Sequence, residues 1–207
     1  MALSLFIGRG AVANSTVPLF PLHTVLFPDG PLPLRIFEPR YLDMISRCMK
    51  ESGYFGVVLV DEAAADQFSA NKIGTLANIV DWYQGSDGIL GVTAHGNQRF
   101  MLHDVSVQSD GLYVGEVEVL EEEAPQKLPD EFRGMADLLR NIIDDLGLLY
   151  TDFEKRYDDA TWVGYRFAEI LPISLDEKQY CLEQSDPIAR LEFLQPLLRT
   201  VRQETSQ

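Results

Sequence analysis

The chain has 207 residues, of which 32 are acidic and 17 are basic, so its formal net charge at neutral pH is −15. Binding to nucleic acid depends on clustered lysine and arginine side chains for the phosphates, so this charge argues against a nucleic-acid-binding protein. It argues equally against docking on an anionic membrane. The hydrophobic fraction of 46% and the aromatic fraction of 10% are those of a folded globular chain with one or two compact units.

Targeting and redox signals are weak in this chain. The apolar run Leu3–Ile7 is too short for a secretory signal and no basic residue precedes it, so residues 1–16 are expected to form a flexible N-terminus. No apolar run approaches the length of a membrane span. Cys48 and Cys181 lie far apart, which favours two buried, reduced thiols and a cytoplasmic location.

Residues 17–124 are predicted to form a β-rich subdomain with one helix. Strands are expected at 17–22 and 32–36, where the prolines favour positions at sheet edges or bulges. The spacing of apolar residues predicts a helix over 39–51, with Pro39 in the first turn, where no N–H is needed. Further strands are expected at 55–60, 72–84, 88–95, 98–108 and 112–120.

Two turns with Asp-Gly chemistry connect these later strands and favour hairpins, at Gly85-Ser86-Asp87-Gly88 and at Ser109-Asp110-Gly111. The first does not match a nucleophile elbow, because the position two residues before the serine is Gln84 and not glycine. Seven short strands with one helix therefore predict a closed or half-closed β unit.

Residues 125–207 are predicted to form a helical subdomain of four helices, after a charged connector that contains two prolines. Ser174 and Glu177 have the spacing of a capping box at the start of the third helix. Pro196 lies inside the fourth helix and is expected to kink or split it. The predicted fold class is thus α+β. The four helices are expected over 132–146 and 159–171, and from 174 and 186 onward.

An ordered set of short motifs resembles the N-terminal domain family of Lon proteases. The set comprises Pro18–Leu22 (PLFPL), Leu26–Pro28 (LFP), Pro33-Leu34, Ile36–Tyr41 (IFEPRY), Phe55–Val58, Ile73–Thr75, Gly96–Phe100, Tyr113–Leu120 and Glu177–Gln179 with Leu182-Glu183, Asp186 and Arg190-Leu191. The match runs from about 17 to 199. It departs from the family pattern at Asp29-Gly30, where one extra residue enters the turn.

The resemblance implies a partly closed barrel of the PUA-like type, followed by a helical bundle. It also implies that the chain recognises unfolded or partly folded polypeptides, or another protein partner. The sequence has no phosphate-binding G-x-x-x-x-G-K-[ST] loop and ends before any Ser–Lys protease domain. We therefore expect a free-standing, non-catalytic member of the family, acting as an adaptor or regulator in protein quality control.

The stretch Leu34–Tyr41 (LRIFEPRY) has two interpretations. As a binding surface, Arg35, Arg40 and Tyr41 would hold an extended peptide. As a structural joint, Glu38 would cap the helix and pair with Arg35 or Arg40, because a carboxylate near a helix N-terminus is favoured and an arginine fork fits a carboxylate. The joint is the favoured interpretation, with a binding groove at its border.

Large aromatic side chains supply binding energy where a groove leaves them partly open, and they fill a β core otherwise. The sequence leaves both roles open. No catalytic, cofactor-binding or metal-binding residue is assigned, because His23, His95 and His103 and the carboxylate runs lack ligand spacing. The candidate peptide-binding residues are Phe27, Arg35, Phe37, Arg40, Tyr41, Phe55, Trp82, Tyr83 and Arg99.

Two alternatives to peptide recognition remain. PUA-like folds include RNA binders and small-ligand binders, although the charge of this chain opposes RNA binding. A small-molecule enzyme with its site between the two subdomains is the other alternative, although the sequence shows no convergent nucleophile, base or cofactor motif.

Overall fold

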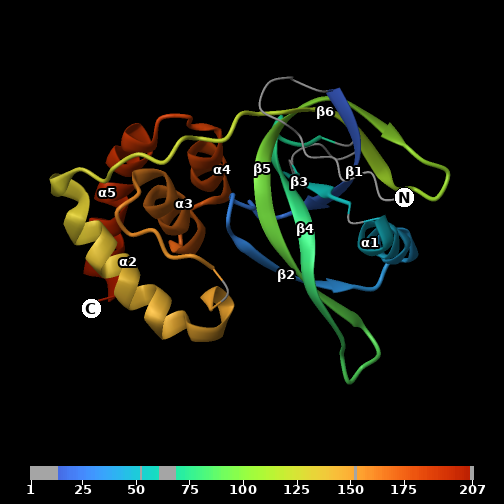
Figure 1. Ribbon diagram of the computed structural model, residues 1–207, viewed down its shortest axis with the longest axis horizontal. Helices are drawn as coiled ribbons and strands as arrows, with labels where there is room; N and C mark the ends of the chain where they lie inside the picture. The colour runs from blue at the N-terminus through green and yellow to red at the C-terminus, as the bar shows by residue number, and fades with distance from the viewer. Residues whose placement is uncertain (1–13, 52, 61–68, 152, 206–207) are drawn as a thin grey trace.

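The computed structural model describes residues 14–51, 53–60, 69–151 and 153–205 (Figure 1). β1 begins at Asn14, inside the segment that the sequence predicts to be flexible; the rest of that segment lies outside the described residues. The strands are β1 (Asn14–Leu22), β2 (Pro31–Ile36), β3 (Phe55–Leu59), β4 (Ile73–Gln84), β5 (Leu90–Val107) and β6 (Tyr113–Val119). The helices are α1 (Pro39–Glu51), α2 (Arg133–Leu146), α3 (Ala160–Ile170), α4 (Leu175–Glu183) and α5 (Pro187–Thr205), with short 3₁₀ turns at η1 (Asp130–Phe132) and η2 (Gly147–Tyr150).

The six strands form one sheet that curls into a partly closed barrel. Their order is β2-β5-β4-β3-β1-β6, and a further pairing of β5 with β6 closes the ring. β1 and β3 run parallel, whereas the other pairs are antiparallel. The helices α2 to α5 gather at one side of the barrel, and α1 lies at the other (Figure 1). The predicted α+β class, a β barrel with one helix followed by a helical bundle, is confirmed.

One prediction about the strands is wrong. The expected strands 88–95 and 98–108 are a single strand, β5, of 18 residues. β5 pairs with β2 over Leu90–His95 and with β6 over Phe100–Val107, so it changes its partner near Gly96. The opposite strand β4 shows a register shift at the same place, between Thr75 and Ala77. The residues Gly96-Asn97 therefore mark an irregularity where the strand bends, and not a turn.

Both Asp-Gly turns are confirmed as hairpins. Gly88 and Gly111 have φ angles of 80° and 82°, in the left-handed region that glycine adopts without steric cost. In the first turn the backbone N–H of Gly85 donates to Ile89 O at 2.8 Å, and in the second that of Gln108 donates to Leu112 O at 2.9 Å. The β4–β5 hairpin extends beyond the barrel as an arm (Figure 1).

The helical part packs around α3, whose residues from Ala160 to Ala168 are all buried. Asp159 caps this helix by accepting from Thr161 N at 3.0 Å. The predicted capping box of Ser174 and Glu177 is present at the start of α4. α5 continues through Pro196 to Thr205, so this proline does not split the helix.

Three clusters of buried apolar side chains stabilise the fold. One fills the barrel and includes Leu19, Phe100 and Val117. The second lies between the sheet and α1, where Phe55 and Met44 are fully buried. The third and largest joins α2 to α5 with barrel residues such as Phe27, Leu59 and Ile73, so the helices share their core with the barrel. Within the residues that the structure describes, no helix is both long and apolar enough to cross a membrane.

Candidate functional site

An apolar groove of about 420 Å³ lies between the C-terminal end of β1 and the strand β2. β6 pairs with β1 only over Asn14–Pro18, and β2 pairs with β5 alone among the described strands. One edge of β1 and the outer edge of β2 are therefore left open, and both border the groove. The apolar groove is lined by Phe20, Pro21, Leu22, His23, Leu34, Arg35, Ile36, Phe37, Glu38, Arg40, Tyr41, Val60 and Tyr113.

The stretch LRIFEPRY forms one wall of this groove and is also a structural joint. Arg40 binds Glu38 Oε2 at 2.7 Å and donates to the carbonyl of Gly111 at 2.9 Å. The backbone carbonyl of Glu38 accepts from Tyr41 N at 3.0 Å in the first turn of α1. The ring of Tyr41 stacks on Phe20, with centroids 4.2 Å apart, and burial raises the pKa of its hydroxyl. These contacts fix the geometry of the groove wall.

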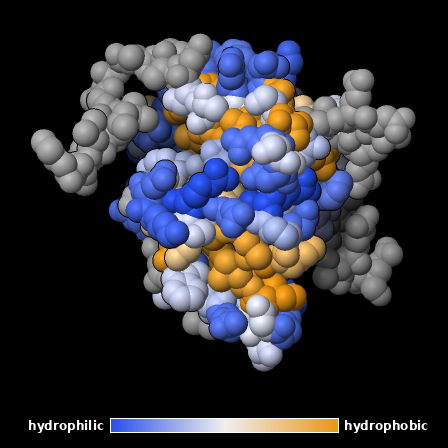
Figure 2. All heavy atoms as spheres, turned by 90° about the vertical axis from the view of Figure 1, so that its right-hand side faces the viewer, coloured by the Kyte–Doolittle hydropathy of each residue, from blue (hydrophilic) through white to orange (hydrophobic). Residues whose placement is uncertain are grey.

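Phe37 is the most exposed large hydrophobic residue of the described chain, with 69% of its surface accessible to solvent. It stands at the rim of the groove, directly after the end of β2. Exposing a phenylalanine forgoes the favourable free energy of its burial, about 1.5–3 kcal/mol, so such exposure marks a place where a partner would gain by covering it. Figure 2 shows the side of the molecule that lies to the right in Figure 1, where hydrophobic residues gather above and below a hydrophilic band.

The structure brings four of the nine candidate residues, Arg35, Phe37, Arg40 and Tyr41, to one place. Arg35 forms an ion pair with Asp87 in the β4–β5 turn, which ties the groove wall to the hairpin arm. The groove also uses Phe20 and Tyr113, which the sequence did not single out. Strand periodicity alone does not reveal which strand edges stay open, so no local signal could have identified them.

The other five candidates lie elsewhere. Phe27 and Phe55 are fully buried and offer no surface to a peptide in this structure. Trp82 and Tyr83 are each 56% exposed, but they lie on the hairpin arm, outside the groove. Arg99 is buried beside a second hollow, which is described next.

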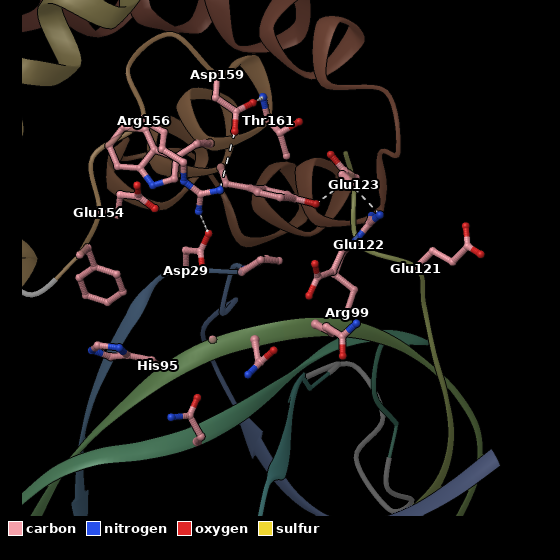
Figure 3. A pocket seen from close by; sticks show the side chains of 18 residues that line it. Asp29, His95, Arg99, Glu121, Glu122, Glu123, Glu154, Arg156, Asp159 and Thr161 are labelled. Carbon is pink, nitrogen blue, oxygen red and sulfur yellow. Dashed lines mark hydrogen bonds and ion pairs between the residues drawn. The ribbon is translucent and has the colours of Figure 1, made fainter. Parts of the chain in front are cut away.

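A second hollow, the junction cavity, has a volume of about 440 Å³ and lies where the barrel meets the helices (Figure 3). The middle of β5, the connector after β6 and the segment before α3 all contribute to its walls. Its lining is mostly polar. The lining residues are Pro28, Asp29, Asn78, His95, Gly96, Asn97, Gln98, Arg99, Glu121, Glu122, Glu123, Phe153, Glu154, Arg156, Asp159, Thr161, Trp162 and Tyr165.

A buried ionic cluster forms one wall of the junction cavity. Glu123 Oε1 binds Arg99 at 2.9 Å and Arg190 at 2.7 Å, and it accepts the hydroxyl of Tyr165. Arg99 also donates to Leu182 O at 2.7 Å. The guanidinium of Arg190 lies 3.9 Å from the ring centroid of Tyr165, and burial raises the pKa of that tyrosine. This cluster joins β5, the connector and the helices α3 to α5.

A second set of contacts holds the turn before β2 against the helices. Asp29 has a φ of 54°, in the left-handed region, which is uncommon for a residue with a side chain. Arg166 donates to the carbonyls of Pro28, at 2.7 Å, and of Asp29, while Arg156 pairs with the Asp29 carboxylate. Arg166 also pairs with Glu169 at 3.1 Å. The turn that departs from the family motif is thus the part of the barrel that α3 holds.

The histidines do not assemble a metal site in the described residues, where no group of three His, Cys, Asp or Glu side chains is arranged to hold an ion. His95 packs its ring on Phe153, with centroids 4.1 Å apart. His103 lies 3.0 Å from Glu118.

Comparison with known proteins identifies the family. Residues 16–200 match the model of the ATP-dependent protease La (LON) substrate-binding domain. The chain belongs to the Lon substrate-binding domain family. The resemblance inferred from the sequence motifs is confirmed.

Individual relatives agree with the family. The Lon N-terminal domain protein from Xanthomonas campestris has a crystal structure that superposes with a TM-score of 0.74 at 35% identity, over 88% of this chain and 98% of that one. The Lon protease of Erwinia amylovora is 25% identical over 196 residues, 89% of this chain and 24% of its own length. The protein cereblon of Danio rerio is 29% identical over 55% of this chain and 27% of its own. The chain thus spans about a quarter of the length of these curated relatives.

Proposed function

We propose that this Lon substrate-binding domain recognises polypeptides by covering an apolar or aromatic side chain of an unfolded segment in the apolar groove. The observation that carries the proposal is the exposed Phe37 at the rim of a groove whose walls are mostly apolar. Burying one such ring against a partner contributes about 1.5–3 kcal/mol, which is enough to act as a binding hot spot.

Side chains, more than backbone pairing, provide the affinity in this proposal. β2 carries Pro31 and Pro33 on alternate positions, and proline has no N–H to donate to an added strand. Prolines of this kind protect a sheet edge from pairing with other chains. An added peptide strand would therefore form few backbone hydrogen bonds with β2. Arg35, Arg40 and Tyr41 border the groove and would orient the backbone or the carboxylates of the bound segment.

In this proposal the chain is a binding module without catalytic activity of its own, and it serves as an adaptor or regulator in protein quality control. Its net charge of −15 opposes the phosphate contacts that RNA binding needs, so polypeptides are the favoured partners. The cytoplasmic location stays a prediction from the two separate cysteines.

The test is binding of a fluorescently labelled, permanently unfolded protein at physiological salt, measured by fluorescence anisotropy. We expect saturable binding by the native chain, and an affinity lower by about tenfold or more in Phe37→Ala, because the variant loses most of one buried ring. A short single-stranded RNA should not bind.

Val107→Ala is the matched control, because Val107 is also an exposed apolar residue, with 61% of its surface accessible, and it does not line the groove. It should leave the affinity unchanged. Equal losses in both variants would mean that general surface hydrophobicity drives binding. No binding by the native chain would refute polypeptide recognition.

A further inference from the structure

The junction cavity carries an excess of negative charge that the protein does not neutralise. Six carboxylates line it, against two guanidinium groups. Arg99 is already paired with Glu123, and Arg156 is paired with Asp29 and lies 3.9 Å from Asp159. Both arginines are therefore occupied by their own partners, and the remaining carboxylates are left without a counter-charge.

Glu122 and Glu154 are carboxylates that face the cavity and have no partner of their own among the described residues. Neither forms a hydrogen bond or an ion pair with another residue in the described part of the chain. They approach the cavity from different elements, Glu122 from the connector after β6 and Glu154 from the segment before α3. Figure 3 shows them on opposite sides of the cavity, whereas the side chain of Glu121 points outward.

Buried polar atoms without a partner provide an independent indication of a missing ligand. Glu123 Oε2 has no hydrogen-bond donor, although only 7% of the Glu123 side chain is exposed. The indole N–H of Trp162, a residue that is 2% exposed and also lines the cavity, has no acceptor. Buried polar groups are nearly always hydrogen-bonded, so Glu123 Oε2 favours a ligand that brings a hydrogen-bond donor, whereas the indole N–H of Trp162 needs a separate acceptor, such as a water molecule or a peptide carbonyl.

The arrangement of the carboxylates argues against a metal ion as the cation of this cavity. No group of three potential ligand residues in the described chain is close enough to hold one, so the carboxylates are spread around the cavity. A volume of about 440 Å³ fits an organic group better than a bare ion. Phe153, Trp162 and Tyr165 add aromatic surface to the lining, which suits an alkyl chain and attracts a cation.

We propose that the junction cavity binds an organic ammonium or guanidinium group on a flexible alkyl chain, with Glu122 and Glu154 as its counter-charges. Two sources supply this chemistry, a free polyamine or a lysine or arginine side chain of a bound polypeptide. The proposal does not rest on the apolar groove, which lies on another part of the barrel. The junction cavity would thus bind cationic groups, while the apolar groove would bind apolar side chains.

Isothermal titration calorimetry at physiological salt tests the proposal with two probes. The first is spermidine. The second is a five-residue peptide with one arginine among glycines and with both ends capped, paired with the same peptide containing citrulline, the neutral analogue of arginine. We expect saturable binding of spermidine, of the arginine peptide, or of both, and none of the citrulline peptide. Which of the two binds identifies the source of the cation.

Three isosteric variants locate the site. Glu122→Gln and Glu154→Gln should each weaken the binding about tenfold, because each removes one charged hydrogen-bond partner. Glu116→Gln is the matched control, since Glu116 is an exposed carboxylate on β6 away from the cavity, and it should change the affinity by less than about twofold. All three residues are exposed, so the variants should fold, which circular dichroism verifies.

Two outcomes would overturn the proposal. If neither spermidine nor the arginine peptide binds in a saturable way, the cavity is not a cation site. If all three variants weaken binding equally, the net charge of the whole protein attracts the probes and the cavity has no special role. Binding that depends on Glu122 and Glu154 but not on Glu116 supports it.

Discussion

The carboxylate of Glu123 is expected to be a main determinant of how firmly the barrel and the helices are joined. Three donors converge on its Oε1: the guanidinium groups of Arg99 and Arg190, and the hydroxyl of Tyr165. In Glu123→Gln the amide oxygen can still accept these bonds, but it carries no negative charge, so both guanidinium groups lose their counter-charge. A hydrogen bond to a charged group contributes about 1 kcal/mol more than a neutral one, so three such bonds predict a loss of about 3 kcal/mol.

This loss agrees with the cost of about 3–5 kcal/mol for breaking a buried ion pair. It is a large part of the 5–15 kcal/mol by which a typical domain is stable. The assay is urea unfolding followed by far-ultraviolet circular dichroism, with the slope of the unfolding free energy on urea checked for each variant. A change in midpoint at constant slope would report a change in stability alone.

A control variant at a surface ion pair and a double mutant test whether the buried cluster acts as a unit. Asp137→Asn breaks the exposed pair with Arg140 and should cost less than about 1 kcal/mol. The effects of Glu123→Gln and Arg190→Met should not add, because the two side chains share one interaction. If Glu123→Gln costs no more than Asp137→Asn, or if the two effects add fully, the cluster does not act as a unit and the reasoning is wrong.

Two further predictions concern stability. Gly96→Ala should destabilise the protein by about 1–3 kcal/mol in urea unfolding, because the added Cβ would clash with the carbonyl oxygen of Phe27. The control Gly134→Ala, in the open first turn of α2, should instead stabilise the protein by about 0.5 kcal/mol. If Gly96→Ala has no effect on stability, the turn is not closely packed against β5. Burial raises the pKa of the Glu169 carboxyl above 4.5, so the folded protein favours its protonated form. The stability that this protonated carboxyl contributes is fully present below pH 4.5 and is lost as the pH rises through the raised pKa. The free energy of unfolding of the native chain should therefore fall relative to that of Glu169→Gln above pH 4.5, and a constant difference would refute the raised pKa.

The helices and turns can be predicted from the sequence because the residues that determine them lie close together in the chain. The capping box of Ser174 and Glu177 and the two Asp-Gly turns each occupy a few consecutive residues, and the structure has them where the sequence predicts them. Glu38 and Arg40 pair as the structural-joint interpretation expected, again over a short separation. Such features depend on chemistry within one turn of chain, which the order of residues states directly.

The contacts between the barrel and the helices could not be predicted from the sequence, because the residues that form them are far apart in the chain. Glu123 meets an arginine 67 positions later, and Arg35 pairs with Asp87, 52 positions away. No periodicity links such residues. β5 was divided in two because Gly96-Asn97 is typical of a turn when neighbouring strands are unknown; only pairing with β2, β4 and β6 shows that the strand continues. The sequence alone also predicts Phe27 and Phe55 as binding candidates, because aromatic residues look alike in sequence whether they are buried or exposed; both are fully buried.

The closure of the barrel has a consequence for the synthesis of this chain on the ribosome. Asn14 in the first strand lies opposite Glu118 in the last, so β1 cannot complete its pairing until nearly the whole barrel has been translated. At roughly 5–20 residues per second, those hundred or so residues take roughly 5–20 s. Arg166 and Arg190, which hold the barrel against the helices, emerge later still. A domain that would cover the exposed apolar segments of other chains thus leaves its own first strand incomplete for seconds. Pairing between strands so far apart in the sequence also predicts slow folding.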